Sequence, residues 1–171
     1  MWRGLPLAHS YDLTVFSLGQ DMEIERSAEI VWPYLAALEQ VPLWEHGILE
    51  VKRIDPGPFF VGMRFTARRI YAGKATHLDG NVRIVEEGRS MTAALRGGPL
   101  VEALLTYSVD PVGADRCRVT YSATGRVRFP LNLLNLIFPA LGRAETRKNL
   151  ARLRRRILAG IPPTSNVPTP D

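Results

Sequence analysis

Six short segments of alternating polar and apolar residues follow one another through the middle of the chain, and tight turns separate them. The separators are rich in glycine and proline, as in Pro56-Gly57-Pro58 and Gly97-Gly98-Pro99. Period-two alternation is typical of strands with one buried face, and loops this short join antiparallel neighbours. The sequence therefore predicts an antiparallel meander. Its strands are expected over residues 48–55, 61–71, 77–86, 90–96, 101–110 and 117–127.

A further strand and two short helices are predicted ahead of the meander. Residues 11–25 alternate in the same way, although the run Gly19-Gln20-Asp21 is expected to interrupt them by a bulge or a hairpin-like break. Ser27 suits the N-cap of a helix, which Pro33 either kinks or forces to start later. Pro42 is expected to open a second, shorter helical segment.

A long helix is predicted to close the domain. Apolar residues recur at helical spacing near the end of the chain, and Pro139 is expected to separate this helix from a helical piece over residues 131–138. The buried stripe of the long helix is expected to consist of Leu150, Leu153 and Ile157, continued upstream by Ala144 and Leu141.

Length and composition are those of one globular domain. The chain has 171 residues, of which 46% are hydrophobic, so it can bury a sizeable core without a metal or a disulfide. We expect one domain over residues 11–159, between a flexible lead-in over 1–10 and a disordered, proline-rich tail over 160–171. The single Cys117 cannot form an intramolecular disulfide, and no stretch is long and apolar enough to span a bilayer. The expected location is the cytoplasm.

The basic excess of the chain is confined to one segment. The formal net charge is +5, and residues 143–156 alone carry seven basic side chains against one acidic side chain. A nucleic-acid-binding surface draws basic residues from several elements, so no nucleic acid is expected as a partner. The basic run is expected to be the solvated face of the last helix, with a weak contact to an anionic lipid surface as the alternative.

Five local segments resemble those of one known superfamily. They are residues 27–32, Trp44, and residues 61–63, 82–86 and 149–154. Together with the order of the elements, they are similar to the START-like (SRPBCC) superfamily and its polyketide cyclase/dehydrase-like family. The resemblance implies an α+β helix-grip fold, in which a curved seven-strand antiparallel sheet wraps around the long C-terminal helix and two short helices follow strand one. It also implies a deep apolar cavity between the sheet and that helix.

Alternation predicts which side chains face this cavity. Inward faces carry tyrosines and one arginine among apolar residues, a combination that suits a hydrophobic ligand oriented by a few polar groups. The alternative is that the tyrosines are ordinary core residues and that Arg69 reaches solvent. The candidate ligand-binding residues are Trp44, Phe65, Arg69, Tyr71, Tyr107, Tyr121, Asn135, Phe138 and Leu141.

The strand over residues 77–86 is expected to decide between two kinds of cavity. One of its faces carries Leu78, Gly80, Val82 and Ile84, and the other carries His77, Asp79, Asn81 and Arg83. The apolar face turned inward would make the cavity oily, whereas a one-residue slip would place groups suited to proton transfer or enolate stabilisation inside it. The candidates for catalysis are His46, Arg69, Tyr71 and Arg83.

Two functions stay open on the sequence. The protein either binds a small hydrophobic, lipid- or polyketide-like molecule and catalyses its cyclisation or dehydration, or it is a non-catalytic carrier of such a ligand. Neither C-x-x-C nor H-E-x-x-H nor a glycine-rich phosphate loop occurs, so no metal and no cofactor is expected. The expected assembly is a monomer or a homodimer.

Overall fold

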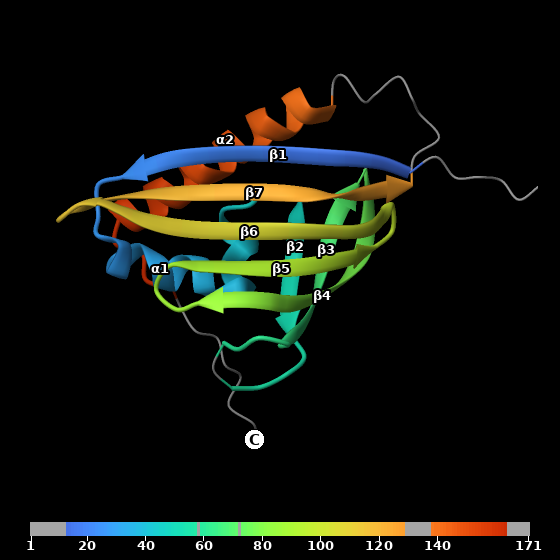
Figure 1. The fold of residues 1–171 in the computed structure, drawn as a ribbon, viewed down its shortest axis with the longest axis horizontal. Helices are drawn as coiled ribbons and strands as arrows, with labels where there is room; N and C mark the ends of the chain where they lie inside the picture. The colour runs from blue at the N-terminus through green and yellow to red at the C-terminus, as the bar shows by residue number, and fades with distance from the viewer. Residues whose placement is uncertain (1–12, 58, 72, 129–137, 164–171) are drawn as a thin grey trace, which may run out of the picture.

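A curved, seven-stranded antiparallel sheet wraps around one long helix (Figure 1). This computed structural model describes residues 13–57, 59–71, 73–128 and 138–163, and only the backbone of residues 13, 14 and 138–141. The strands are β1 (Leu13–Ile24), β2 (Ile48–Arg53), β3 (Arg64–Tyr71), β4 (Lys74–Glu86), β5 (Ser90–Gly97), β6 (Leu100–Gly113) and β7 (Arg116–Arg128). The helices are α1 (Ala28–Ala36), the 3-10 helix η1 (Leu38–Leu43) and α2 (Phe138–Leu158).

The strand order follows the predicted meander. The sheet runs β1-β7-β6-β5-β4-β3-β2, and every neighbouring pair is antiparallel. Because β1 pairs with β7, the first strand closes onto the last, and β1 and β2 form the two edges of the sheet. The predicted α+β helix-grip fold, with two short helices after strand one and a long C-terminal helix, is confirmed.

The first strand is continuous, so the bulge or break predicted at residues 19–21 is wrong. Its register with β7 runs without a shift from Leu13 opposite Arg128 to Ile24 opposite Cys117. Val15 points outward and is 72% exposed. The even-numbered residues from Phe16 onward are the ones that face inward. With this phase, the exposed Gly19 and Asp21 fit an unbroken alternation.

The two short helices begin where the chain leaves β1. Ser27 is the N-cap of α1 by its backbone conformation, although its side chain makes no capping hydrogen bond. Pro33 lies inside α1, where burial of Val31 and Leu35 stabilises a helix that lacks one backbone hydrogen bond. The second helix, η1, begins at Leu38 and contains Pro42 near its end, so the prediction that Pro42 opens it is wrong.

Helix α2 buries a stripe that is more polar than predicted. Leu150, Leu153 and Ile157 are buried as expected, but Ala144 is exposed, because it lies on the opposite side of the helix. Upstream of Leu150, the buried side of the helix instead carries Thr146 and Asn149, as the helical repeat requires. Pro139 lies in the first turn of α2, where its missing N–H has no intrahelical partner to lose. Of the helical piece predicted over residues 131–138, only Phe138 is described, and it belongs to α2, so Pro139 does not separate it from the long helix.

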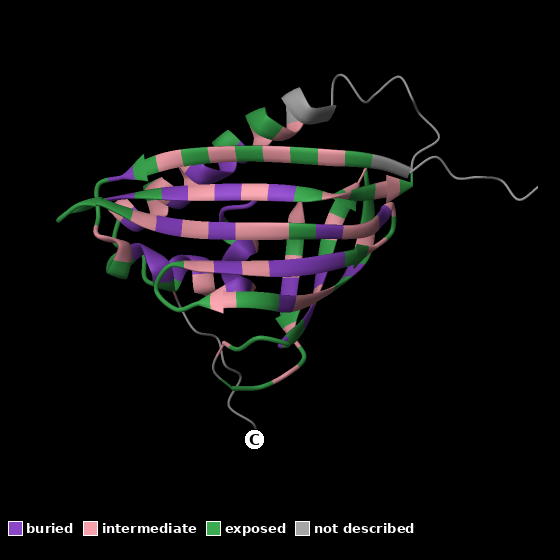
Figure 2. Cartoon of the chain, viewed as in Figure 1, coloured by how far each residue is buried: buried purple, intermediate pink, exposed green. Residues whose placement is uncertain are grey.

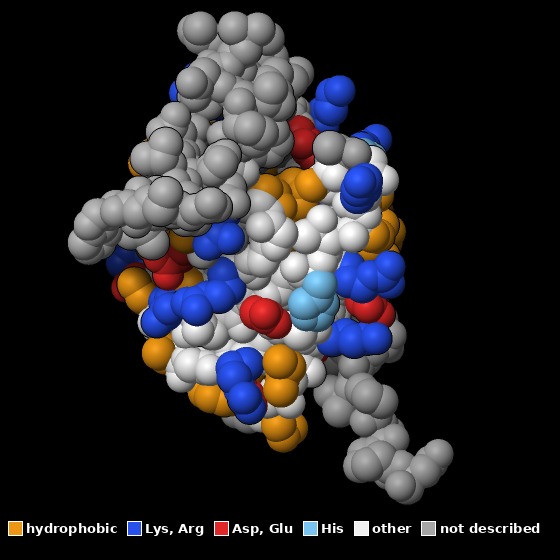
Figure 3. Space-filling view, turned by 90° about the vertical axis from the view of Figure 1, so that its right-hand side faces the viewer, with side chains coloured by type: hydrophobic (Ala, Val, Ile, Leu, Met, Phe, Trp, Pro, Cys, Tyr) orange, Lys and Arg blue, Asp and Glu red, His pale blue; other side chains and the backbone are white. Residues whose placement is uncertain are grey.

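The decisive strand, β4, turns its apolar face inward. Leu78 and Val82 are buried, and a register shift between Val82 and Ile84 then reverses the alternation, so that Ile84 is 58% exposed, contrary to its predicted place on the inward face. His77 and Asp79 lie in solvent, with their side chains 62% and 70% exposed. Figure 3 shows the end of the sheet where β3 turns into β4, and its surface carries charged side chains of both signs and a histidine.

Glycines on the inward face give the neighbouring aromatic rings room across the sheet. One cross-strand row runs Phe16, Gly125, Ala103, Leu95, Gly80 and Phe65. A Cβ on Gly80 would collide with the ring of Phe65, and one on Gly125 would lie 2.5 Å from the Glu102 carbonyl oxygen and 2.9 Å from the ring of Phe16. Figure 2 shows buried residues alternating with residues of intermediate burial along the central strands.

Substitution of Gly125 by alanine is therefore expected to destabilise the fold. The added methyl group would press on the backbone of β6, and such overpacking costs about 1–3 kcal/mol of unfolding free energy. The matched control is Gly19→Ala, because the nearest atom to a Cβ at Gly19 is 3.9 Å away. Urea unfolding of both variants measures the difference, and equal stabilities would contradict the close packing assigned to Gly125.

Candidate functional site

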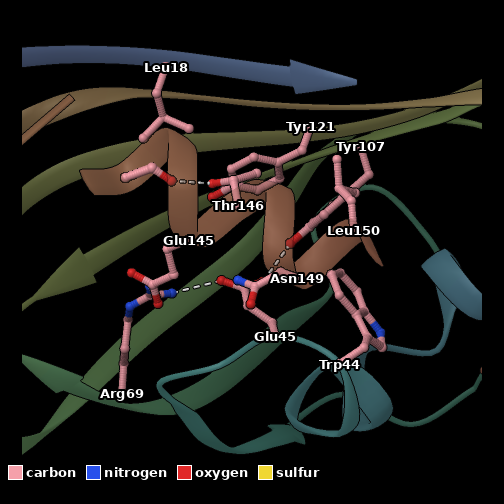
Figure 4. A pocket seen from close by; sticks show the side chains of 11 residues that line it. Leu18, Trp44, Glu45, Arg69, Tyr107, Tyr121, Glu145, Thr146, Asn149 and Leu150 are labelled. Atoms are coloured by element: carbon pink, nitrogen blue, oxygen red, sulfur yellow. Dashed lines mark hydrogen bonds and ion pairs between the residues drawn. The ribbon is translucent and has the colours of Figure 1, made fainter. Parts of the chain in front are cut away.

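A small cavity of about 70 Å³ lies between α2 and the inward face of the sheet (Figure 4). Its wall is built from β1, the segment between η1 and β2, and strands β3, β6 and β7 on one side, and from α2 on the other. The lining residues are Leu18, Trp44, Glu45, Arg69, Tyr107, Tyr121, Gly142, Glu145, Thr146, Asn149 and Leu150.

Glu45 is the buried acid of this cavity. The residue is 5% exposed, and its Oε1 accepts a hydrogen bond of 2.7 Å from Arg69 Nη1. Its Oε2 accepts a second one, also of 2.7 Å, from Tyr107 Oη. A carboxylate can be buried at tolerable cost only when it is paired and hydrogen-bonded. Arg69 and Tyr107 together meet this requirement.

Two aromatic rings pack against the ring of Tyr107 and fix the position of its hydroxyl. Tyr107 and Tyr121 lie directly opposite each other on β6 and β7, with their ring centroids 5.0 Å apart. The ring of Trp44 meets Tyr107 edge-on at 5.6 Å. Such tilted and edge-on pairs add stability beyond the burial of their area. The aromatic cluster therefore orients the Tyr107 hydroxyl toward Glu45.

Charged groups continue from Glu45 to the rim of the cavity. Arg69 Nη2 lies 3.6 Å from Glu145 Oε1 on α2, and the Arg69 guanidinium lies 5.7 Å from the ring centre of Tyr71. His46 Nδ1 lies 3.9 Å from the same Glu145 oxygen, with the His46 side chain 71% exposed. The ionisable side chains thus lead from the buried Tyr107 to the solvent-exposed His46.

Asn149 joins α2 to the segment between η1 and β2. Its Oδ1 accepts a hydrogen bond of 3.1 Å from the backbone N–H of His46 and one of 3.0 Å from Arg152 Nη1. Thr146, one turn earlier, donates its hydroxyl to the Gly142 carbonyl at 2.8 Å. Helix α2 therefore contributes the Asn149 amide, whose oxygen already accepts hydrogen bonds, and the Thr146 hydroxyl, which already donates one.

Burial keeps the tyrosines of the site protonated. It raises the pKa of Tyr107 and of Tyr121, and the neighbouring Glu45 carboxylate raises both further. Burial also raises the pKa of Tyr71, although Arg69 opposes this. Burial alone would lower the pKa of Arg69, but the attraction of Glu45 outweighs it, and the pKa lies above its ordinary value. All three hydroxyls are therefore hydrogen-bond donors at neutral pH.

The structure gathers some of the predicted ligand-binding residues around the cavity and leaves others out. Trp44, Arg69, Tyr107 and Tyr121 line it. Phe65 is buried in the core and does not line the cavity. Tyr71 does not line it either, although its ring centre lies 5.7 Å from the Arg69 guanidinium. Asn135 and the side chains of Phe138 and Leu141 lie outside the described residues.

Of the candidates for catalysis, too, some line the cavity and others lie outside it. Arg69 faces the cavity, whereas His46 lies at its rim in solvent and Arg83 is exposed on β4. The polar face of β4 therefore brings no acid and no base into the cavity, because the strand keeps its apolar face inward up to Val82. The buried acid is Glu45 instead.

Sequence reasoning missed Glu45, Thr146 and Asn149. The last two could have been found, because they fall on the helical repeat of the buried stripe with Leu150 and Leu153. Glu45 carries no such signal, since it lies in an irregular segment after Trp44 where no period applies. Its burial follows only from the pairing partners that β3 and β6 supply.

Two further findings concern metals and membranes. Among the described residues, no group of three or more His, Cys, Asp or Glu side chains is placed to hold a metal ion. In the same part of the chain, no helix has the length and apolar character required to cross a membrane.

Comparison with known proteins agrees with the helix-grip architecture. Residues 16–158 match the family described as polyketide cyclase / dehydrase and lipid transport. The chain belongs to this family. A search of curated proteins finds no match.

Solved structures with the same fold share little sequence with this chain. TTHA0849 from Thermus thermophilus has a TM-score of 0.72 at 17% identity, covering 85% of this chain and 99% of its own. The Zhui aromatase/cyclase from a Streptomyces species has a TM-score of 0.72 at 9% identity, covering 87% and 97%. A START superfamily protein from Mycobacterium smegmatis has a TM-score of 0.70 at 18% identity, covering 84% and 97%. The fold is that of the START-like superfamily.

Tyr121→Phe is expected to reduce the loss of folding stability at high pH. Because the pKa of Tyr121 is raised in the folded state, its contribution to stability is complete below the unfolded pKa of about 10 and falls as the pH rises above it. The variant should match the wild type within about 0.5 kcal/mol at pH 7. Above pH 10 the wild type should lose about 1.4 kcal/mol per pH unit relative to the variant. Urea unfolding at pH 7, 10 and 11 measures this, and parallel losses would contradict the burial of the hydroxyl.

Proposed function

We propose that the protein binds a small, mainly hydrophobic molecule in the cavity between α2 and the sheet. The observation that carries the proposal is the buried, hydrogen-bonded Glu45–Arg69–Tyr107 cluster on the cavity wall. Replacing a buried ion pair by apolar side chains is often neutral or stabilising, so packing alone does not require this cluster. A cavity whose wall combines aliphatic and aromatic side chains with placed polar groups suits ligand recognition.

The dimensions of the cavity limit how such a ligand enters. Its volume of about 70 Å³ is well below the roughly 300–1,000 Å³ of typical small-molecule pockets. One end of the ligand therefore fits between Trp44, Tyr121 and Leu150, and the remainder lies toward the rim near Glu145. Membership of the polyketide cyclase / dehydrase and lipid transport family supports a ligand of lipid or polyketide type.

Cofactor-free cyclisation or dehydration is the second candidate function. It is favoured by a buried carboxylate next to a guanidinium, since a carboxylate can take up a proton and a cation can stabilise a developing enolate oxygen. The similarity in fold to the Zhui aromatase/cyclase supports the same chemistry. Both Glu45 oxygens already accept hydrogen bonds, however, so binding is the function that the geometry supports best.

Filling the cavity should abolish binding of an apolar probe. Gly142→Leu places a side chain on α2 that points at Leu18, since a Cβ at Gly142 lies 3.2 Å from Leu18 Cδ2. Ethylbenzene titrated into the ¹⁵N-labelled protein should shift the amide signals of the lining residues in the wild type and not in Gly142→Leu. The matched control is Ala144→Leu on the exposed side of the same helix, which should bind as the wild type does. Binding unaffected by Gly142→Leu would place the ligand elsewhere and overturn the proposal.

A dehydration assay tests the second candidate. The aldol adduct 4-hydroxy-4-phenylbutan-2-one loses water to form an enone that absorbs in the near ultraviolet. Acceleration by the wild type, reduced at least about tenfold in Glu45→Gln, would support Glu45 as the base, because proton transfer by a placed side chain contributes roughly 10²–10⁴-fold. A rate equal to that of buffer would overturn the catalytic role for this substrate class and leave binding as the function.

A further inference from the structure

Three acceptor groups on the wall of the cavity already accept hydrogen bonds. Glu45 uses one oxygen for Arg69 and the other for Tyr107, each at 2.7 Å. The Gly142 carbonyl accepts the Thr146 hydroxyl, and the Asn149 oxygen accepts two hydrogen bonds. A ligand group that donates a hydrogen bond to one of these three acceptors would displace an existing contact, at the cost of a buried group left unpaired.

The amide of Asn149 can have only one orientation. Its Oδ1 receives a backbone N–H and a guanidinium N–H, and only the oxygen of an amide can accept both. The Nδ2 group is therefore at the other end of the amide and makes no hydrogen bond within the described part of the chain. Asn149 is 5% exposed and lines the cavity, so this donor is available to a group bound there.

Tyr121 supplies a second free donor from the opposite wall. The residue is 9% exposed and lines the cavity from β7, and its hydroxyl donates no hydrogen bond to any described residue. Its neighbour Tyr107 differs, since that hydroxyl is committed to Glu45. Figure 4 shows Tyr121 and Asn149 around the same space, one from the sheet and one from α2.

We propose that the buried end of the ligand carries an uncharged carbonyl oxygen, held by Tyr121 Oη and Asn149 Nδ2. This inference rests on the proposed binding function and names the chemical class of its ligand: a ketone, ester or amide rather than a free acid or a plain hydrocarbon. An oxygen between the two walls would accept hydrogen bonds from Tyr121 and Asn149 at once. The small volume of the cavity, about 70 Å³, confines the end of the ligand to their neighbourhood.

The charges of the cavity favour a neutral ligand. Arg69, the cation of the lining, is already paired with Glu45 at 2.7 Å, and Glu145 adds a second carboxylate at the rim. Arg152 contacts the far end of the Asn149 amide and does not line the cavity. A buried carboxylate on the ligand would therefore lack a free cation, and an unpaired buried charge is costly.

Three probes of nearly equal shape separate these ligand classes. Acetophenone carries the carbonyl, ethylbenzene replaces it by a methylene group, and benzoate replaces the methyl ketone by a carboxylate. Titration of the full chain, followed by amide chemical shifts, should show acetophenone binding about three- to tenfold tighter than ethylbenzene, which corresponds to one net hydrogen bond. Benzoate should bind more weakly than acetophenone.

Two substitutions assign the effect to the two donors. Tyr121→Phe should reduce the affinity for acetophenone about three- to tenfold and leave that for ethylbenzene unchanged. Asn149→Asp keeps the acceptor used by His46 and Arg152 but replaces the donor by an acceptor, so it should weaken acetophenone at least as much. Tyr34→Phe removes a tyrosine hydroxyl in α1, away from the cavity, and is the matched control with no expected effect.

The outcomes distinguish this inference from the function on which it rests. Ethylbenzene binding equal to that of acetophenone, or acetophenone binding insensitive to Tyr121→Phe, would overturn the carbonyl assignment and leave hydrophobic binding intact. Benzoate as the tightest ligand would overturn the neutral class. Absence of binding by all three probes would overturn the proposed function itself. Tyr121→Phe alone suffices for the first comparison if Asn149→Asp fails to fold.

Discussion

Burial of one carboxylate organises the interior of this protein. Glu45 lies in an irregular segment between η1 and β2, where no regular element holds it, and it is 5% exposed. Its charge is tolerated because β3 supplies Arg69 and β6 supplies Tyr107 at hydrogen-bonding distance. These two strands are not neighbours in the sheet. The sheet curves around α2, and side chains from both strands meet at this one carboxylate.

Helix α2 completes this arrangement from the other side. Asn149 accepts the backbone N–H of His46, and Glu145 lies near both Arg69 and His46. The segment that carries Glu45 is thus held by α2 through the backbone hydrogen bond of His46, and the His46 side chain lies 3.9 Å from Glu145 of the same helix. A displacement of the helix would therefore be transmitted to the cavity wall, which makes α2 part of the site as well as the cover of the core.

The sequence predicts the architecture far better than the site, because the architecture is encoded in patterns that repeat along the chain. Strand alternation and turn residues repeat over many positions, so errors such as the phase of Val15 or Ile84 leave the meander unchanged. Tyr107 and Tyr121 could be placed by the same alternation. Glu45 could not, since its burial depends on contacts with residues 24 and 62 positions away along the chain. The burial of Asn149 could have been predicted, because it is a polar residue on an apolar helical stripe.

The two halves of α2 have different roles, and this has a consequence for how such proteins diversify. Leu153 and Ile157 secure the C-terminal half of the helix in the core, whereas the turns that carry Gly142, Glu145 and Thr146 face the cavity. Changes in those earlier turns alter the shape and polarity of the cavity while the anchoring half stays intact. One scaffold can therefore acquire new ligands by a few substitutions in two helical turns, and its stability and its specificity can evolve almost separately.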